Sequence, residues 1–286
     1  MERVCFWYDG RHRNDGPPLF LRQAALRHKD ELGLSAADHK IPLPDHKRWG
    51  KYDLNIWVDF GEDGLPEGYV EAPGPNSVYW CSDSHLGLEY RLKKAKEFDW
   101  VFVTIPRHIE AFKDAVGHDR VYWLPHAGEP TCYNKLSTLK KYDVCFVGHL
   151  PNADRVDLLE QLFAEFPNFY YGQKFFEEAN QKYNESKIVF NHAIDKEANM
   201  RVFESSLSGS LQLCSYGEDI EKLGYKDGEN IVFYNSPEEM IEKARFYLDN
   251  EPLLETIAEA GYQHTLNNHT YLHRIKTILE TVRRGK

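Results

Sequence analysis

Short strand-like segments alternate with helical segments along this chain, and this alternation restricts its fold more than any other feature of the sequence. In the first half, β-branched and aromatic residues concentrate in five segments, at 3–10, 52–61, 77–83, 100–105 and 120–128. Helical patterns stand between the later segments, at 89–98 and 108–116. Strands of this length separated by helices predict a parallel sheet with helices on both faces.

The second half repeats the alternation after a polar stretch at 128–142, which is the best candidate for a linker. Its strand-like segments lie at 142–148, 187–191, 211–215 and 230–234. A helix after the first of them is indicated by apolar residues at helical spacing, namely Leu159, Leu162, Phe163 and Phe166. The predicted fold is therefore an α/β fold with two Rossmann-like domains whose parallel sheets face a central cleft. Ligands of such sheets bind beyond the carboxyl ends of the strands.

Helix starts and one amphipathic helix are also visible in the sequence. Asp15 is expected to cap a helix with Pro17 in its first turn, and Ser236 to cap one that begins with Pro237. A further helix is expected over 267–284, where four apolar residues share one face: Tyr271, Ile275, Ile278 and Val282. Such a helix needs a surface to cover.

The composition is that of a globular protein and excludes several classes. Apolar residues make up 42% of the 286 residues and charged residues 28%, which a disordered chain does not show. No apolar run is long enough to span a membrane, and the N-terminus has no signal-peptide core, so a cytoplasmic protein is expected. The five cysteines are scattered without a C-x-x-C pair, so we expect reduced thiols rather than a zinc ribbon or a disulfide framework.

The net charge and the absence of several motifs argue against further functional classes. The net charge of −10 argues against broad nucleic-acid binding, although the stretch 39–51 is either a local basic groove or a solvated basic loop. The sequence contains no G-x-G-x-x-G, no P-loop, no H-E-x-x-H and no G-x-S-x-G. Its thirteen histidines form no ligand set, so neither a metal site nor a bound cofactor is expected.

The start of the expected helix at 199–208 is the strongest candidate binding site. Asn199 is placed to cap this helix, whose amino end carries partial positive charge suited to a phosphate. Arg201 supplies a permanent charge and paired donors for a diphosphate. Glu204, one turn later, is spaced to accept hydrogen bonds from two adjacent hydroxyls, as ribose offers. The alternative is an Arg201–Glu204 ion pair on a solvated helix face, which contributes only about 0.3–0.5 kcal/mol.

Three segments, at 142–162, 183–213 and 225–250, carry a resemblance to a known family. They resemble the C-terminal domain of GT-B glycosyltransferases of group 1 type, and more closely the bacterial spore-maturation-type glycosyltransferase family. The resemblance covers residues 142–266, and its most specific part is the core that contains Asn199, Arg201 and Glu204. The segments 79–87 and 121–130 resemble the acceptor domain of the same family more weakly.

The resemblance implies roles for individual residues. It implies that Glu204 holds the ribose of a nucleotide, and that Arg201 and Asn199 line the diphosphate and the sugar. It also implies that the backbone at Gly148 approaches the donor closely. Four further residues match positions near the base and the phosphates: Arg155, Tyr183, Ser186 and Lys187.

The half of the chain before the linker is expected to supply the acceptor side. Asp83 and His85 follow directly after a strand, and either group is suited to accept the proton of an acceptor hydroxyl. In the other interpretation, Asp83 or Ser84 caps the next helix. His126 ends a later strand, where it contacts a substrate or satisfies backbone groups. The loop 10–16 is expected among the acceptor loops.

The resemblance also implies a domain arrangement. An N-terminal acceptor domain is expected at 1–134 and a C-terminal nucleotide-sugar donor domain at 142–266. The closing helix, at 267–286, is expected to pack back on the N-terminal domain. A hinge near 133–142 would then allow the domains to close over the donor.

The implied activity is a metal-independent transfer of a hexose-type sugar from a nucleotide-sugar, with UDP favoured as the nucleotide. The acceptor is a hydroxyl of a glycan, a protein, a small molecule or a modified DNA base. One departure from the family motivates an alternative. Many relatives carry a second Glu eight residues before the ribose Glu, and here that position is Lys196, with Glu197 beside it. The alternative is a non-catalytic nucleotide-sugar-binding protein or a GT-B-fold sugar-nucleotide epimerase.

Overall fold

The computed structural model describes residues 1–8, 16–40, 51–59, 76–150, 153–193 and 197–285. These residues form two compact units, which are Met1–His126 together with Tyr271–Lys286, and Ala127–Thr270. The chain therefore passes between the units after His126 and after Thr270, whereas the sequence suggested boundaries at 134 and 266. The expected acceptor loop, most of the basic stretch and Lys196 lie outside the described residues.

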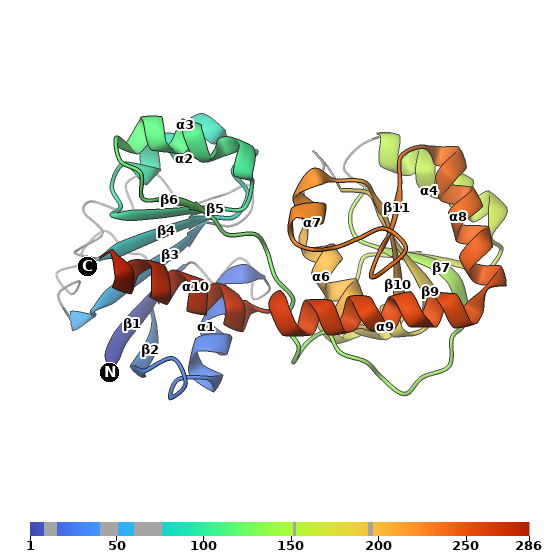
Figure 1. The fold of residues 1–286 in the computed structure, drawn as a ribbon, viewed down its shortest axis with the longest axis horizontal. Helices are drawn as coiled ribbons and strands as arrows, with labels where there is room; N and C mark the ends of the chain where they lie inside the picture. The colour runs from blue at the N-terminus through green and yellow to red at the C-terminus, as the bar shows by residue number, and fades with distance from the viewer. Residues whose placement is uncertain (9–15, 41–50, 60–75, 151–152, 194–196, 286) are drawn as a thin grey trace. The chain divides into compact units, whose positions relative to one another are not determined.

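The first unit is built around a six-stranded sheet in the order β2-β1-β3-β4-β5-β6. All neighbouring strands are parallel. The strands are β1 (Glu2–Trp7), β2 (Leu34–Lys40), β3 (Leu54–Asp59), β4 (Ser77–Cys81), β5 (Trp100–Val103) and β6 (Val121–Trp123). Its helical segments are α1 (Pro17–Arg27), α2 (Leu88–Ala95), η2 (Pro106–His108), α3 (Ile109–Val116) and α10 (Tyr271–Arg284). Figure 1 shows α2 and α3 on one face of this sheet and α1 and α10 on the other.

The core of this sheet is aromatic, as the strand compositions indicated. Trp7 and Trp57 stack at 5.1 Å between ring centroids, and Trp7 donates through Nε1 to Asn55 Oδ1 at 2.9 Å. On the other face, α10 is amphipathic, and its four apolar residues Tyr271, Ile275, Ile278 and Val282 are at most 1% exposed. This helix packs against α1 within the first unit.

The second unit is built around a five-stranded parallel sheet in the order β11-β10-β9-β7-β8. Its strands are β7 (Tyr142–Val147), β8 (Phe169–Gly172), β9 (Ser186–Asn191), β10 (Leu211–Ser215) and β11 (Val232–Tyr234). Its helices are α4 (Ala153–Glu165), α5 (Phe176–Asn184), α6 (Met200–Leu207), α7 (Glu218–Lys222), α8 (Pro237–Asp249) and α9 (Glu251–Asn268). One apolar cluster joins the sheet to α4, α8 and α9, and another joins it to α5 and α6. The predicted α/β class with two parallel sheets is therefore confirmed.

Several elements differ from the sequence prediction. The strand β2 was not expected because its sequence, LSAADHK, has no β-branched or aromatic residue, and β8 was missed because its aromatic segment, FYYG, is only four residues long. The helix expected over 267–284 is α10, which begins four residues later than expected, at Tyr271, because α9 extends to Asn268. Ser236 does cap α8, with its hydroxyl oxygen accepting from Glu239 N at 3.2 Å. Asp15 lies outside the described residues.

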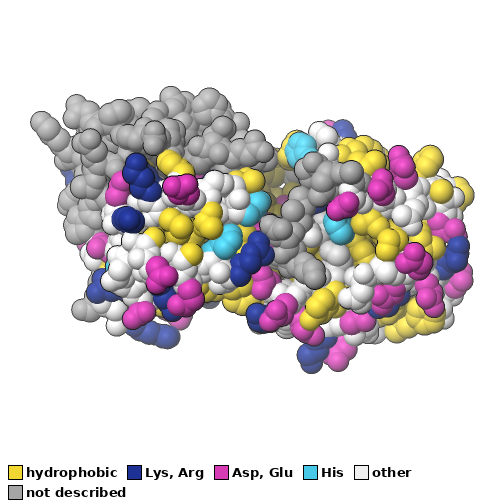
Figure 2. Space-filling model, turned by 90° about the horizontal axis from the view of Figure 1, so that it is seen from above, with side chains coloured by type: hydrophobic (Ala, Val, Ile, Leu, Met, Phe, Trp, Pro, Cys, Tyr) yellow, Lys and Arg dark blue, Asp and Glu magenta, His cyan; other side chains and the backbone are white. Residues whose placement is uncertain are grey.

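Charge is divided unequally between the two units. Most of the acidic excess of the chain falls in Ala127–Thr270, and acidic side chains are spread over the surface of this unit in Figure 2. The net charge of −10 is therefore a property of the second unit rather than of the first. None of the helices that the structure describes is long and apolar enough to cross a membrane.

Candidate functional site

The strand order of the second unit creates a topological switch point at one end of its sheet. From β7 the chain continues to β8 on one side, and it later returns to β9 on the other side. The connections on the two sides leave opposite faces of the sheet, so they separate at the carboxyl ends of β7 and β9. Ligands of doubly wound sheets bind at such a switch point. The residues at these two strand ends are therefore the first place to search for a site.

Arg201 occupies this switch point. It comes from the first turn of α6, and its Nε donates to Val147 O at the end of β7 at 2.9 Å. Its Nη1 donates to Asn191 Oδ1 at the end of β9, also at 2.9 Å. The guanidinium stands 4.4 Å from the centroid of the Phe146 ring, a cation–π contact. Arg201 is thus turned to the strand ends, so the alternative of an ion pair on a solvated helix face does not describe it.

A second arginine, Arg155 of α4, joins Arg201 at the same place. It is 5% exposed, and it donates to His149 O at 3.0 Å and to His192 O at 2.8 Å. Its guanidinium also faces the Phe146 ring, at 5.5 Å. Burial, together with the positive charge of Arg201, lowers the pKa of Arg155 to about 10. The fold therefore concentrates two positive charges at one switch point, where an anion would be stabilising.

Gly148 leaves room for Arg201. Its φ is +151°, a backbone conformation that L side chains rarely adopt. A Cβ built at this position would stand 2.1 Å from Arg201 Nη2, well inside contact distance. Only glycine allows the backbone after β7 and the guanidinium to lie so close together. The structure thus shows Arg201 close to the backbone at Gly148, while the predicted approach of the donor to this backbone stays a prediction.

Asn199 precedes α6 as expected, but its side chain does not cap the helix. Its amide pairs with that of Asn191 at the end of β9, with both N···O distances at 3.1 Å. The capping role is thus a wrong prediction, because the strand end offers the amide two hydrogen bonds at once. This pair connects Asn199 to Arg201, since Asn191 Oδ1 accepts from both.

Glu204 lies one turn further along α6 and acts on two buried tyrosines. The side chain of Tyr133 hydrogen-bonds to Glu204, and burial together with this carboxylate raises the pKa of Tyr133. Tyr183 of α5 lies 6.3 Å from Tyr133 between ring centroids and hydrogen-bonds to Arg201. Burial, followed by the charge of Glu204, raises the pKa of Tyr183. Sequence reasoning missed Tyr133, for which the only signal is a tyrosine within a polar linker.

Two predicted residues lie elsewhere. Ser186 is the first residue of β9, and its hydroxyl donates to Lys182 O at 2.7 Å. Lys187 forms an ion pair with Glu251 at 2.8 Å. Asn191 ends the same strand, and five residue steps of extended chain span about 17 Å. Ser186 and Lys187 are therefore at the amino edge of the sheet, and the structure does not bring them to the arginine pair.

The first unit gathers polar groups at the carboxyl end of β4. Asp83 and His85 follow this strand, and both act electrostatically on the buried His126. Burial is the main cause that lowers the pKa of His126, whereas the Asp83 carboxylate raises it. The imidazole hydrogen-bonds to the backbone of Ser82, which is the second of the two roles considered for it. The cap of α2 is Gly87, so Asp83 and Ser84 do not cap that helix.

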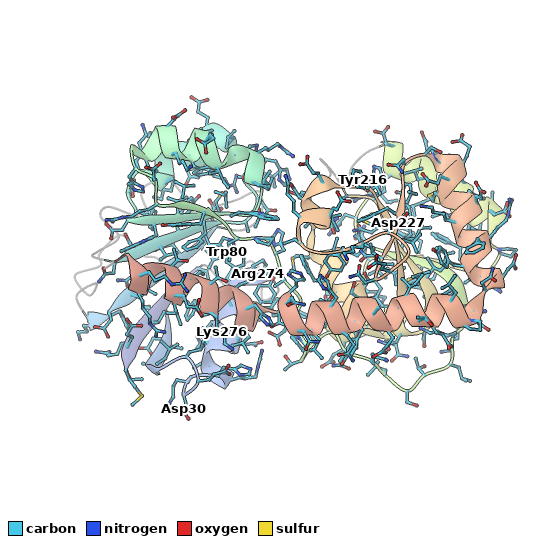
Figure 3. The ribbon with its side chains drawn as sticks, viewed as in Figure 1. Asp30, Trp80, Tyr216, Asp227, Arg274 and Lys276 are labelled. Atoms are coloured by element: carbon cyan, nitrogen blue, oxygen red, sulfur yellow. The ribbon has the colours of Figure 1, made fainter. Side chains whose placement is uncertain are left out.

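Arg274 of α10 holds the segment that carries His126. Its Nε donates to Pro125 O at 2.9 Å, and its Nη2 donates to His126 O at 2.8 Å. Figure 3 shows Arg274 near Trp80, whose Nε1 donates to Leu124 O at 3.1 Å. Two side chains from different elements thus set the path of residues 124–126. In the parts of the chain that are described, no group of three or more His, Cys, Asp or Glu side chains is arranged to hold a metal ion.

Solved structures resemble the whole of this chain. Anabaena HepE, solved with UDP and glucose, matches with a TM-score of 0.71 at 14% identity, covering 99% of this chain and 100% of HepE. The DNA-modifying enzyme β-glucosyltransferase matches with a TM-score of 0.63 at 13% identity, covering 100% of this chain and 98% of that enzyme. These similarities confirm the GT-B fold with its two parallel sheets.

A longer protein also matches. S. aureus TarM gives a TM-score of 0.59 at 10% identity over 80% of this chain, and the chain spans 54% of TarM. Among curated proteins, no relative matches significantly. The model of the family described as glycosyl transferase-like matches residues 134–280, which is about half of the chain and includes Arg155, Arg201 and Glu204. This chain is a member of the glycosyl transferase-like family.

Proposed function

We propose that this chain transfers a hexose-type sugar from a UDP-sugar to an acceptor hydroxyl. The observation that carries the proposal is the arginine pair at the switch point of the second unit. Arg155 and Arg201 share the Phe146 ring, and the charge of one lowers the pKa of the other. A diphosphate brings negative charge and several acceptor oxygens to such a pair, which relieves the repulsion and adds charge-assisted hydrogen bonds.

The other residues of the site fit the rest of a nucleotide. Because Gly148 has no side chain, the Arg201 guanidinium can lie against the backbone that follows β7, where its charge would meet a phosphate. Glu204 accepts the ribose hydroxyls in this proposal, held in place by Tyr133. UDP is the proposed nucleotide, because HepE and the DNA-modifying β-glucosyltransferase, which share the fold, were solved with UDP or UDP-glucose.

The arrangement also provides a mechanism. Negative charge develops on the diphosphate as its bond to the sugar breaks, and the two guanidinium groups stabilise that charge without a metal ion. The acceptor hydroxyl loses its proton to Asp83 or His85, which lie together at the carboxyl end of β4 in the first unit. We also propose that the chain belongs to the spore-maturation-type branch, on the sequence resemblance, and that it acts in the cytoplasm, where its five free cysteines stay reduced.

Thermal shift with UDP, GDP, ADP and their hexose conjugates tests the proposal. At a ligand concentration about 100-fold above Kd, binding to the folded chain adds about 2.7 kcal/mol to the free energy of unfolding. We expect one UDP-sugar to raise Tm and to be converted slowly to free UDP on incubation. Release of an isomerised UDP-sugar would instead identify an epimerase, and a raised Tm without turnover would identify a binding protein. No shift with any nucleotide would contradict the arginine-pair site.

The linker residue Tyr133 is expected to matter for nucleotide affinity. Tyr133→Phe removes the hydroxyl that holds Glu204, and the loss of one hydrogen bond of about 0.5–1.5 kcal/mol weakens UDP binding roughly 3- to 10-fold. In this proposal Tyr133 acts on the ribose only through Glu204. The double variant Tyr133→Phe/Glu204→Ala is therefore expected to bind UDP only slightly more weakly than Glu204→Ala alone. Calorimetry with UDP measures both effects, with Tyr247→Phe on α8 as the control. Fully additive losses would contradict the positioning role.

A further inference from the structure

Two histidines at the carboxyl end of α9 direct ring nitrogens to one backbone oxygen. His264 Nε2 lies 2.9 Å from Leu223 O, and His269 Nε2 lies 2.8 Å from the same oxygen. The two Nε2 atoms are 3.2 Å apart. Three electron-rich atoms from two segments of the second unit therefore form one small triangle. Neither histidine takes part in the proposed transfer reaction.

Hydrogen bonds alone do not satisfy the two Nε2 atoms and the Leu223 oxygen well. A neutral imidazole carries one donor nitrogen and one acceptor nitrogen. If both Nε2 atoms carry protons, the two N–H groups lie against each other at 3.2 Å while sharing Leu223 O. If only one carries a proton, the lone pair of the other faces the carbonyl oxygen. A cation removes both conflicts, because the two nitrogens and the oxygen then all act as lone-pair donors.

The distances match those around a transition-metal ion. Imidazole nitrogens lie about 2.0–2.1 Å from zinc, so two ligands separated by 90–109° are about 2.8–3.4 Å apart. The Nε2···Nε2 distance of 3.2 Å and both Nε2···O distances, 2.8 and 2.9 Å, fall within this interval. Imidazole suits Zn²⁺ and Cu²⁺. The three atoms would occupy one face of the coordination sphere, with water in the remaining positions.

The imidazole rings are held in place by neighbouring groups. Tyr225 is fully buried, with the His264 ring edge-on to it at 4.7 Å and the His269 ring stacked on it at 5.6 Å. The Tyr225 hydroxyl is anchored on Thr265 Oγ1 at 2.7 Å. Gly224, at φ +84°, lies so close that a Cβ there would stand 2.9 Å from His264 Cε1. His269 is buried but His264 is only partly covered, so an ion can reach the triangle from solvent.

We propose that His264, His269 and the carbonyl oxygen of Leu223 form a binding site for a divalent transition-metal ion, Zn²⁺ or Cu²⁺. The site adjoins one of the two places where the chain passes between the units. His269 O accepts from Gly128 N at 2.9 Å, next to the bridge between Gly128 and Thr270. A bound ion would therefore stiffen both connecting segments. This inference does not depend on the proposed transferase activity.

Thermal unfolding of the full chain with ZnCl₂, in a buffer without chelator or thiol, tests the site. At a Zn²⁺ concentration about tenfold above Kd, we expect Tm to rise by about 3 °C. His264→Gln keeps a donor for Leu223 O but has no imidazole, so the rise is expected to disappear. His118→Gln is the matched control, since His118 is also half-buried and accepts from Arg120 N at 3.2 Å, with no second histidine beside it among the described residues. It is expected to leave the shift intact.

Electron paramagnetic resonance with one equivalent of Cu²⁺ gives an independent readout. We expect hyperfine coupling to two imidazole nitrogens in the wild type and to one in His264→Gln. The proposal is overturned if Zn²⁺ leaves Tm unchanged, if His264→Gln shows the same rise as the wild type, or if the copper spectrum is unaffected by that substitution.

Discussion

Arg201→Ala is expected to weaken UDP binding by about 100-fold and to reduce sugar transfer at least as much. Arg201 combines a permanent charge with donors fixed on Val147 O and Asn191 Oδ1, so its remaining N–H groups are already oriented. Hydrogen bonds to charged groups contribute about 1.5–3 kcal/mol each, and about 2.7 kcal/mol corresponds to a 100-fold change in Kd. Calorimetry with UDP and a UDP-release assay measure the two effects.

Two further variants separate charge from geometry at this position. Arg201→Lys keeps the charge, but an ammonium cannot hold both strand ends and still offer a planar pair of donors, so we expect a loss of about tenfold. Arg245→Ala is the control, because Arg245 is 56% exposed and pairs with Glu165 on the surface of the same unit. Wild-type affinity for UDP in Arg201→Ala would show that the arginine pair is not the diphosphate site.

Arg91→Leu is expected to lower the free energy of unfolding by about 3–5 kcal/mol. Arg91 pairs with Asp59 at 3.1 Å, and the side chains are 2% and 0% exposed. The Tyr79 hydroxyl donates to the same carboxylate. Removal of one partner from a buried ion pair leaves an uncompensated charge in the core, which is the costly case. Urea denaturation at pH 7, monitored by tryptophan fluorescence, measures the change.

The pH dependence of this loss follows from the pKa of Asp59. Burial raises it even with Arg91 present, and the Arg91 charge opposes that rise, so Arg91→Leu raises it further. A carboxyl whose pKa is higher in the folded than in the unfolded chain is destabilising where it is ionised, and acidification relieves this cost. The deficit is therefore expected to shrink from pH 7 to pH 5.

A double variant provides the control for this prediction. Asp59→Asn combined with Arg91→Leu removes both charges, so it is expected to be more stable than Arg91→Leu alone and to lose the pH dependence. A deficit below about 1 kcal/mol in Arg91→Leu, or one that grows towards pH 5, would contradict the account of a buried and mutually dependent pair.

The sequence predicted the alternation of strands and helices and singled out the segment that carries Arg201. The segments 100–105 and 142–148 are nearly continuous apolar runs. A strand that is buried on both faces needs such a run, so these strands can be recognised from the sequence alone. The residue type at Arg201 also favoured phosphate recognition, because a permanent charge at a helix start suits an anion, whereas the role of Gly148 was implied by the family resemblance. These inferences depend only on neighbours along the chain.

Predictions that depended on which edge of the sheet a residue reaches, or on a contact with a residue distant in sequence, were less accurate. Ser186 and Lys187 stand in a motif beside the site in sequence, yet a strand runs between them and Asn191. The Asn199 side chain pairs with Asn191 instead of capping its own helix, since pairing across the sheet end satisfies more of its amide. The spacing of residues in the sequence gives their distance along the chain, but it does not show at which edge of the sheet each residue lies.

The sequence by itself determined that this chain forms strands and helices in alternation and that an arginine opens the helix after β9. Only the tertiary structure decided that Arg155 joins Arg201 over the Phe146 ring, and that Tyr133 of the linker reaches Glu204. The physical reason is that a helix or strand is specified by contacts a few residues apart, whereas a site is assembled from chain segments that meet only when the sheet order is set.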